Sequence, residues 1–323
     1  MTQLSSVGRS GLPVLLAALL ALAGSASAAD SADLVVLPDG RRLNLECIGN
    51  GGPTVILESG LGLPVSAWSK VQQGLAGTAR VCTYSRAGYG PSDPGPLPRD
   101  AAHASADLEA LVSAARLPPP YVLVGHSLGG QYARLFAARH EETIAGLVLV
   151  DPIFGNNDRL LSEASPAMAR FLAQEAETIR KCVGAIARGQ PWTQGDPAFS
   201  DCGPPPPQNS PFGSAEMAQA TLSEFEHRET SARQVQGATR RKLRIPIIVL
   251  TASGKRPALQ GSSRDEALAV QAVMVREHRA IAMTSTRGSQ RDVPGAGHVI
   301  QFDRPEAVVE AVQEIVSGVR PPK

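Results

Sequence analysis

Aromatic residues and net charge are both scarce in this sequence. Only 4% of its 323 residues are Phe, Trp or Tyr, and the formal net charge is +1 at pH 7. A nucleic-acid-binding protein needs a basic face and often aromatic side chains on which bases stack. The composition therefore argues against a nucleic-acid partner, and we expect the short basic run 240–242 to be a solvated helix end.

The sequence also lacks an apolar run of membrane-spanning length. The run Val14–Ala23 spans about ten residues, whereas a transmembrane helix needs roughly 20. Small residues at Ala26 and Ala28 follow it in the A-x-A pattern that signal peptidase cleaves. We therefore predict a cleaved signal peptide over residues 1–28, an exported protein in the periplasm or medium, and no stable membrane span. An uncleaved membrane anchor is the alternative.

Cysteine is rare, and its spacing excludes some kinds of site. No C-x-x-C motif and no adjacent histidine accompany the cysteines, so zinc and redox chemistry have little support. In an exported protein an even number of cysteines favours disulfides. Three connectivities are possible among Cys47, Cys82, Cys182 and Cys202.

Strand-like and helix-like segments alternate through most of the chain. This alternation predicts βαβ crossovers and a mainly parallel sheet, with a hairpin at its start. The expected strands are 34–37, 41–48, 54–57, 80–84, 121–124, 146–150 and 245–250, and the expected helices include 66–76, 101–116 and 128–140.

Residues 154–241 interrupt that alternation. Two helical stretches, Pro166–Arg188 and Ala215–Arg240, flank a loop rich in proline and glycine that contains the run Pro204–Pro207. We interpret this segment as a helical insertion between two strands of the sheet.

The segment Gly125–Gly129 fits the G-x-S-x-G pattern between an expected strand and an expected helix. A serine in so tight a turn has a strained backbone, and larger residues in place of the glycines would collide with their neighbours. The turn lifts the Ser127 hydroxyl above the sheet edge, and the following helix start offers the Leu128 N–H to a developing oxyanion. Ser127 is therefore the predicted nucleophile.

A serine hydroxyl needs a base to remove its proton. His298 follows the flexible stretch Gly295–Gly297 shortly before the last helix, and we assign it as the general base. We expect His126 to pack or bond locally. Four further histidines lie in helical stretches and are expected to be exposed surface residues: His103, His140, His227 and His278.

These features make the chain resemble lid-bearing, esterase-like members of the α/β-hydrolase superfamily over essentially all of residues 33–320. The segments that carry the resemblance are Leu57–Gly62 with Trp68 downstream, Tyr84–Gly90, Gly125–Gly129, Leu149–Pro152, and Gly297–His298 before Asp303–Pro305.

The resemblance implies an α/β fold with a mostly parallel eight-stranded sheet flanked by helices. Residues 30–153 and 242–320 would form its core, and residues 154–241 would form a helical cap. In this family the second strand lies beside the fourth, which implies a Cys47–Cys82 disulfide and leaves Cys182 to pair with Cys202. The resemblance also implies that the loop after Leu57 supplies a second oxyanion N–H, best matched here by Leu61.

Two positions depart from the family pattern. Relatives commonly carry aspartate where this chain has Ser85, so the loop after that strand is held differently. The usual acid follows the penultimate strand, yet the stretch Thr251–Arg256 contains none. Asp151 is the preferred substitute, Asp265 the alternative acid, and Asp292 a third choice, because the acid must reach the imidazole.

The expected reaction is hydrolysis of a small-molecule ester through a Ser-His-Asp triad and an acyl-enzyme, without cofactor or metal. A serine nucleophile argues against epoxide hydrolase or haloalkane dehalogenase chemistry, for which this family uses aspartate. Amide, lactone or carbon–carbon bond hydrolysis and perhydrolysis could use the same triad. A catalytically inactive binding module is the alternative from another class.

Overall fold

The computed structural model describes residues 33–319 except 191, 194–195, 197–201, 205–213 and 255–260. The predicted signal peptide, residues 1–28, lies outside the described residues, as does most of the proline run 204–207.

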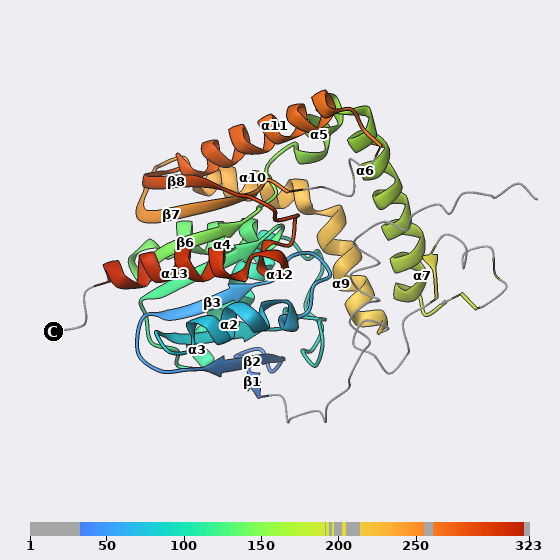
Figure 1. The fold of residues 1–323 in the computed structure, drawn as a ribbon. Coiled ribbons are helices and arrows are strands. Elements are labelled where there is room, and N and C mark those ends of the chain that lie inside the picture. Colours follow the sequence, from blue (N-terminus) through green and yellow to red (C-terminus); the bar gives the residue numbers. More distant parts are fainter. Residues whose placement is uncertain are drawn as a thin grey trace, which may run out of the picture.

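One eight-stranded sheet runs through the middle of the molecule (Figure 1). Its order is β1-β2-β4-β3-β5-β6-β7-β8. The strand β2 pairs antiparallel with β1 and β4, and every pair from β4 to β8 is parallel. The strands are β1 Leu34–Val36, β2 Arg42–Ile48, β3 Thr54–Glu58, β4 Arg80–Tyr84, β5 Tyr121–His126, β6 Ile144–Val150, β7 Leu243–Ala252 and β8 Ser285–Val293.

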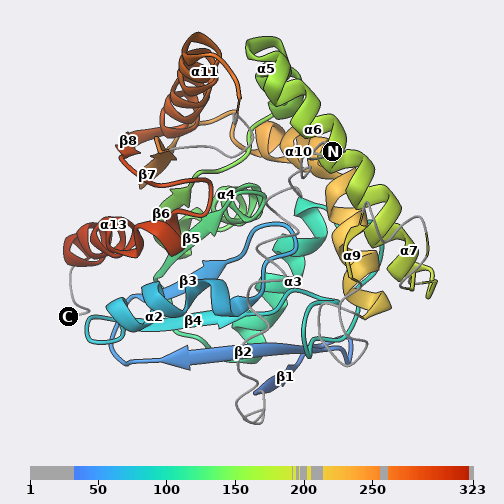
Figure 2. The same ribbon diagram turned by 45° about the vertical axis from the view of Figure 1, so that its right-hand side comes forward.

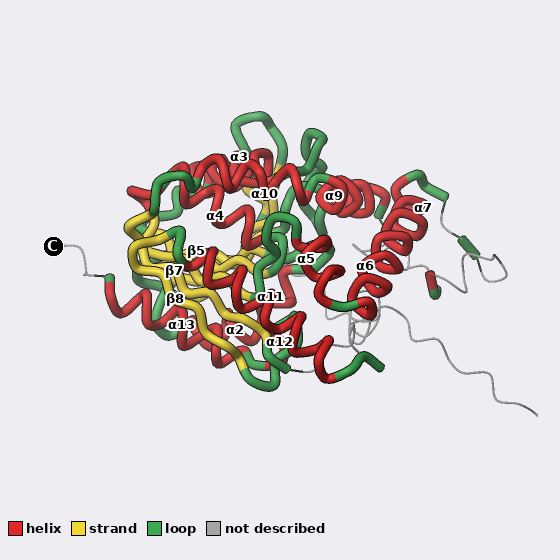
Figure 3. The backbone as a smooth tube through the Cα atoms, turned by 90° about the horizontal axis from the view of Figure 1, so that it is seen from above, coloured by secondary structure: helices red, strands yellow, loops and turns green. Residues whose placement is uncertain are grey.

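Helices cover both faces of this sheet, which explains the continuous apolar runs in its central strands. Figures 2 and 3 show α2 and α13 on one face and α3 and α4 on the other. Successive side chains of a strand point to opposite faces, so Val55 and Leu57 join one apolar core while Ile56 joins the other. The helices outside the segment between β6 and β7 are α2 Ser69–Leu75, α3 Ala101–Ala114, α4 Gly129–Arg139, α11 Arg264–Ala282, α12 Ile300–Asp303 and α13 Pro305–Gly318. The predicted fold class is thereby confirmed.

The segment of chain between β6 and β7 forms a group of helices. In Figures 1 and 2, α6 and α9 lie together beyond one end of the sheet. The helix α6 begins at Pro166, as expected. The Ser165 side chain accepts a hydrogen bond from the Met168 N–H and so caps the start of this helix. The helices of this segment are α5 Asn157–Ala164, α6 Pro166–Thr178, α7 Gly184–Ala187, α9 Ala215–Glu226 and α10 Arg228–Ala238.

The helical stretch expected over residues 215–240 consists of two helices, because the chain breaks at His227 between α9 and α10. The break directs α10 against the core helices α3 and α4. There the Ser231 Oγ accepts the Ala101 N–H at 2.9 Å, and the Gln234 Oε1 accepts the Ala102 N–H at 2.9 Å. The first N–H groups of a helix lack partners within the helix, and α10 supplies them for α3.

The structure pairs the four cysteines as the resemblance implies. Cys47 and Cys82 face each other in the β2–β4 register with their Cα atoms 4.1 Å apart. Cys182 and Cys202 close a loop in the helical insertion, with their Cα atoms 5.7 Å apart. Across the residues that are described, no helix is long and apolar enough to cross a bilayer.

Candidate active site

Ser127 lies in the sharp turn between β5 and α4. Its φ of 52° is in the left-handed region, which non-glycine residues seldom adopt. Glycine is needed on both sides, since a Cβ on Gly125 would lie 2.7 Å from the Gly129 carbonyl oxygen and one on Gly129 would lie 2.4 Å from the Ser59 carbonyl oxygen. The Ser127 N–H donates to the Val150 carbonyl at 3.1 Å. The backbone of this turn is therefore fixed from several sides.

His298 reaches this serine from the loop between β8 and α12. Its Nε2 lies 3.0 Å from the Ser127 Oγ, across 171 positions of sequence. Two contacts anchor the loop: the His126 Nε2 lies 3.0 Å from the His298 backbone oxygen, and the Gly297 N–H donates to the Asp303 carboxylate at 2.8 Å. The hydroxyl and the imidazole are thus already within proton-transfer distance.

Asp151 is the candidate acid that the structure brings to His298. Its Oδ2 lies 2.8 Å from the His298 Nδ1, and its Oδ1 accepts the Ala252 N–H at 2.9 Å. The carboxyl is fully buried at the end of β6. Asp265 and Asp292 lie at exposed positions, and within the described ranges neither forms a hydrogen bond with His298. A carboxylate at Nδ1 keeps the proton on that nitrogen and leaves Nε2 free to accept.

The two residues predicted to supply the oxyanion N–H groups lie near Ser127. Leu128 directly precedes α4, and Leu61 lies in the loop after β3. Both residues line the cavity that contains Ser127. Neither amide donates a hydrogen bond to any group in the part of the chain that the structure describes. An N–H group that has no partner within the protein and faces the nucleophile can stabilise an oxyanion.

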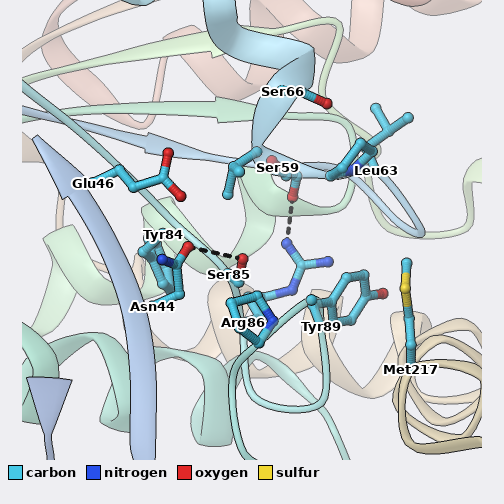
Figure 4. A pocket seen from close by; sticks show the side chains of 14 residues that line it. Asn44, Glu46, Ser59, Leu63, Ser66, Tyr84, Ser85, Arg86, Tyr89 and Met217 are labelled. Carbon is cyan, nitrogen blue, oxygen red and sulfur yellow. Dashed lines mark hydrogen bonds between the residues drawn. The ribbon is translucent and has the colours of Figure 1, made fainter. Parts of the chain in front are cut away.

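A buried arginine holds the loop that carries Leu61 (Figure 4). The Arg86 guanidinium donates to the backbone oxygens of Ser59 and Gly60 at 2.6 and 3.0 Å. It also binds the carboxylates of Glu58 and, from α9, Glu224 at 2.8 and 2.7 Å. Sequence reasoning did not identify this network. A signal for it was Glu58, a charged residue ending the otherwise apolar strand β3.

Tyr89 holds the same loop from its other side. Its hydroxyl accepts the Gly62 N–H at 3.2 Å and donates to Glu224 at 2.7 Å. Burial raises the pKa of Tyr89, so the hydroxyl keeps its proton at neutral pH. The helix α9 is therefore connected to the loop after β3 through two buried side chains.

At Ser85, where relatives commonly carry aspartate, the hydroxyl donates to the Asn44 Oδ1 at 3.2 Å (Figure 4). The Ser92 hydroxyl donates to the Ser85 carbonyl at 2.7 Å and accepts the Asn44 N–H at 2.9 Å. Neutral hydroxyl and amide groups thus anchor the start of this loop.

Two further histidines, His126 and His278, are buried near the site. Burial lowers the pKa of His126 to about 3, so its ring is uncharged at neutral pH. His278, expected at the surface, is fully buried, and its ring contacts the Thr251 hydroxyl and the Pro152 carbonyl, each at 2.8 Å. The expectation for His278 was wrong because it continues the buried face of α11 at a four-residue spacing from Met274.

A cavity of about 230 Å³ opens over Ser127 and His298. Its walls are mainly apolar and come from the core and from the helical insertion. They include Leu61, Leu161, Met168, Phe171, Phe225 and Met274. In the described ranges no group of histidine, cysteine and carboxylate side chains is arranged to hold a metal ion.

Known proteins match this chain in sequence and in fold. A segment of 108 residues is 34% identical to the uncharacterized protein YqjL of Bacillus subtilis and covers 33% of this chain and 43% of that protein. Another segment of 108 residues is 39% identical to the pimeloyl-[acyl-carrier protein] methyl ester esterase of Chromobacterium violaceum, over 33% of this chain and 40% of that protein. Each match therefore spans less than half of the relative.

The fold itself is shared over almost the whole chain. A thermophilic esterase from Thermogutta terrifontis superposes with a TM-score of 0.59 and 22% identity, covering 90% of this chain and 99% of that one. The profile of the alpha/beta hydrolase family matches residues 55–311. With its eight-stranded sheet and this match over most of its length, the chain belongs to the alpha/beta hydrolase family.

Proposed function

We propose that this hydrolase is an exported serine esterase that cleaves small carboxylic esters through an acyl-enzyme. The observation that carries the proposal is the continuous chain of contacts from the Ser127 Oγ to His298 Nε2 at 3.0 Å and from His298 Nδ1 to Asp151 at 2.8 Å. Nucleophile, base and orienting acid are the groups that acyl transfer requires.

In the acylation step, the Ser127 Oγ attacks the ester carbonyl carbon while His298 Nε2 takes the hydroxyl proton. The N–H groups of Leu61 and Leu128 stabilise the negative charge on the carbonyl oxygen. The bond to the alkoxy oxygen then breaks, and His298 returns the proton to the departing alcohol. Asp151 stabilises the imidazolium that exists between these two transfers.

Deacylation repeats the sequence with water. His298 removes a proton from the attacking water, the carboxylic acid leaves, and the Ser127 hydroxyl is restored with that proton. Every group in both steps belongs to the chain, the substrate or water.

We assign residues 154–241 as a cap on a core formed by residues 30–153 and 242–320. Support comes from α6 and α9, whose side chains Phe171 and Phe225 line the cavity above Ser127. Ligand pockets commonly measure about 300–1,000 Å³, so a cavity of about 230 Å³ favours short acyl groups.

Export is the second part of the proposal. The pairing of all four cysteines supports it, because disulfides persist in oxidising compartments and are rare in the cytosol. Cleavage after Ala28 would be checked by sequencing the N-terminus of protein recovered from the periplasm or medium.

A panel of matched substrates tests the chemistry. We expect p-nitrophenyl acetate and butyrate to be hydrolysed faster than the corresponding p-nitroanilides and faster than a lactone of similar size. The long-chain p-nitrophenyl laurate should be hydrolysed more slowly than the butyrate. Ser127→Ala should lower kcat by roughly 10⁴-fold or more, since the nucleophile is lost. Faster turnover of amides or lactones would assign a different bond to the same triad, and no turnover by folded protein would favour a binding module.

A further inference from the structure

One charged side chain interrupts an apolar face of α6 and the helical turn that follows it. This face meets the cavity through Met168, Phe171, Leu172, Glu175 and Ile179. A spacing of three or four residues places such positions on one side of a helix. Four of the five are apolar, so Glu175 stands out from a surface otherwise suited to hydrocarbon.

One carboxyl oxygen of Glu175 has no partner among the described residues. This Oε1 is shielded from solvent and accepts no hydrogen bond from any of them. Burial raises the pKa of this carboxyl to about 7. A buried polar group without a partner destabilises the fold. A ligand that donates a hydrogen bond to this oxygen would offset that cost.

The arginine in the same cavity is already engaged. Arg228 binds the Asp158 carboxylate, donates to the Phe225 carbonyl at 2.6 Å, and lies 4.1 Å from the centre of the Phe225 ring. Asp158 and Arg228 therefore compensate each other, and Asp151 is bound to His298. Among the cavity-lining carboxyls that the structure describes, Glu175 is left without an ion pair, and Arg228 attracts its charge without contacting it.

We propose that Glu175 binds a protonated amino group of the substrate, so that the preferred substrates are small esters carrying an ammonium group. The ammonium N–H would donate to the Glu175 Oε1, and the hydrocarbon linking it to the ester would lie against Phe171 and Leu172. This inference rests on the proposed esterase function. Glu175 acts here as a specificity-determining residue and takes no part in bond breaking.

Matched ester pairs test the inference through catalysis. Each pair replaces a terminal methyl by an ammonium group, once on the acyl side and once on the alcohol side. We expect kcat/KM to favour the ammonium ester of at least one pair, and Glu175→Gln to lower that preference by roughly 10- to 100-fold, the range for a hydrogen bond to a charged group.

Glu177→Gln is the matched control, because Glu177 lies on the same helix at an exposed position. It removes the same charge from α6 and should leave the preference unchanged. Equal preference in the wild type and Glu175→Gln, or equal losses in both variants, would overturn the inference while leaving the esterase proposal intact.

Binding without turnover separates the two proposals. Calorimetric titration with n-butylammonium chloride, against n-butanol and matched sodium chloride, needs no ester. We expect the wild type and Glu177→Gln to bind n-butylammonium more tightly than n-butanol, and Glu175→Gln to lose that difference. Absence of the difference in the wild type would refute the ammonium site even if ester hydrolysis were demonstrated.

Discussion

Two residues beside the cavity carry strained backbones. Ser127 and Asp151 have φ values of 52° and 42°, and each follows a strand at the same end of the parallel sheet. Such conformations persist where the surroundings enforce them, and they cluster at functional sites. The strain therefore accompanies the two residues whose side chains approach His298 from opposite sides of the ring.

Asp151→Asn tests the assignment of the acid. The amide removes the negative charge that favours a proton on Nδ1, so we expect kcat to fall by roughly 10³- to 10⁴-fold with a small change in KM. Asp265→Asn should leave kcat unchanged, because that exposed carboxyl forms no hydrogen bond to His298 in the described structure. A loss of only a few-fold at Asp151 would remove it from the triad.

The buried ring of His126 makes stability depend on pH. Its pKa is about 3 in the folded protein against an ordinary value of 6.5. Between these values the unfolded chain binds a proton that the folded chain does not, so acidification through this range lowers the free energy of unfolding. From pH 7.5 to 5 the loss from this group should be about 2 kcal/mol.

His126→Gln should lose correspondingly less stability over the same interval. The pKa of Glu175 is raised to about 7, so acidification increases the free energy of unfolding through this group. That contribution is the same in the wild type and in His126→Gln. Urea denaturation at the two pH values measures the difference. Equal losses would show that His126 does not titrate as described.

At the scale of the elements, the order of the strands and the contacts of the loops determine where the site lies. The parallel strands β5, β6 and β7 end at one edge, where the loops after β5 and β6 supply Ser127 and Asp151. The loop after β3 is held by Arg86 and Tyr89 against α9. The insertion therefore contributes to the geometry of the site as well as to its walls.

Tyr89→Phe tests this link. Losing the hydroxyl leaves the Gly62 N–H and one oxygen of Glu224 without that partner, so we expect the loop amide of Leu61 to be less well positioned. kcat should fall by about tenfold, with KM nearly unchanged, because an oxyanion donor acts mainly in the transition state. Tyr121→Phe is the control, since its hydroxyl bonds the Leu117 carbonyl. Equal kcat values in the two variants would contradict the link.

Sequence patterns predicted the elements whose residues follow a clear periodicity. The apolar strand β3 and the glycine-flanked turn at Ser127 were identifiable because burial and backbone strain restrict their residue types. The resemblance implied an eighth strand, but the position of β8 was not predicted, since this strand lies at the sheet edge and its sequence Ser285–Val293 is largely polar. Partners such as Arg86 and Glu224, 138 positions apart, depend on tertiary packing that no local pattern records.

For the whole molecule, the second disulfide stabilises the inserted helices. Cys182 and Cys202 are 20 positions apart, and closing a loop of that length stabilises a fold by roughly 3 kcal/mol. Replacing both cysteines by serine should lower the free energy of unfolding by about that amount, as measured in guanidinium chloride. A change below about 0.5 kcal/mol would show that the loop is constrained without the bond.

The central claim, that His298 activates Ser127 as a nucleophile, is tested most directly by labelling with a fluorophosphonate and mapping the adduct by mass spectrometry. We expect one adduct, on Ser127, in the wild type, with labelling abolished in Ser127→Ala and slowed by roughly 10³-fold or more in His298→Ala. An adduct on another residue, or unchanged labelling of folded His298→Ala, would contradict the account.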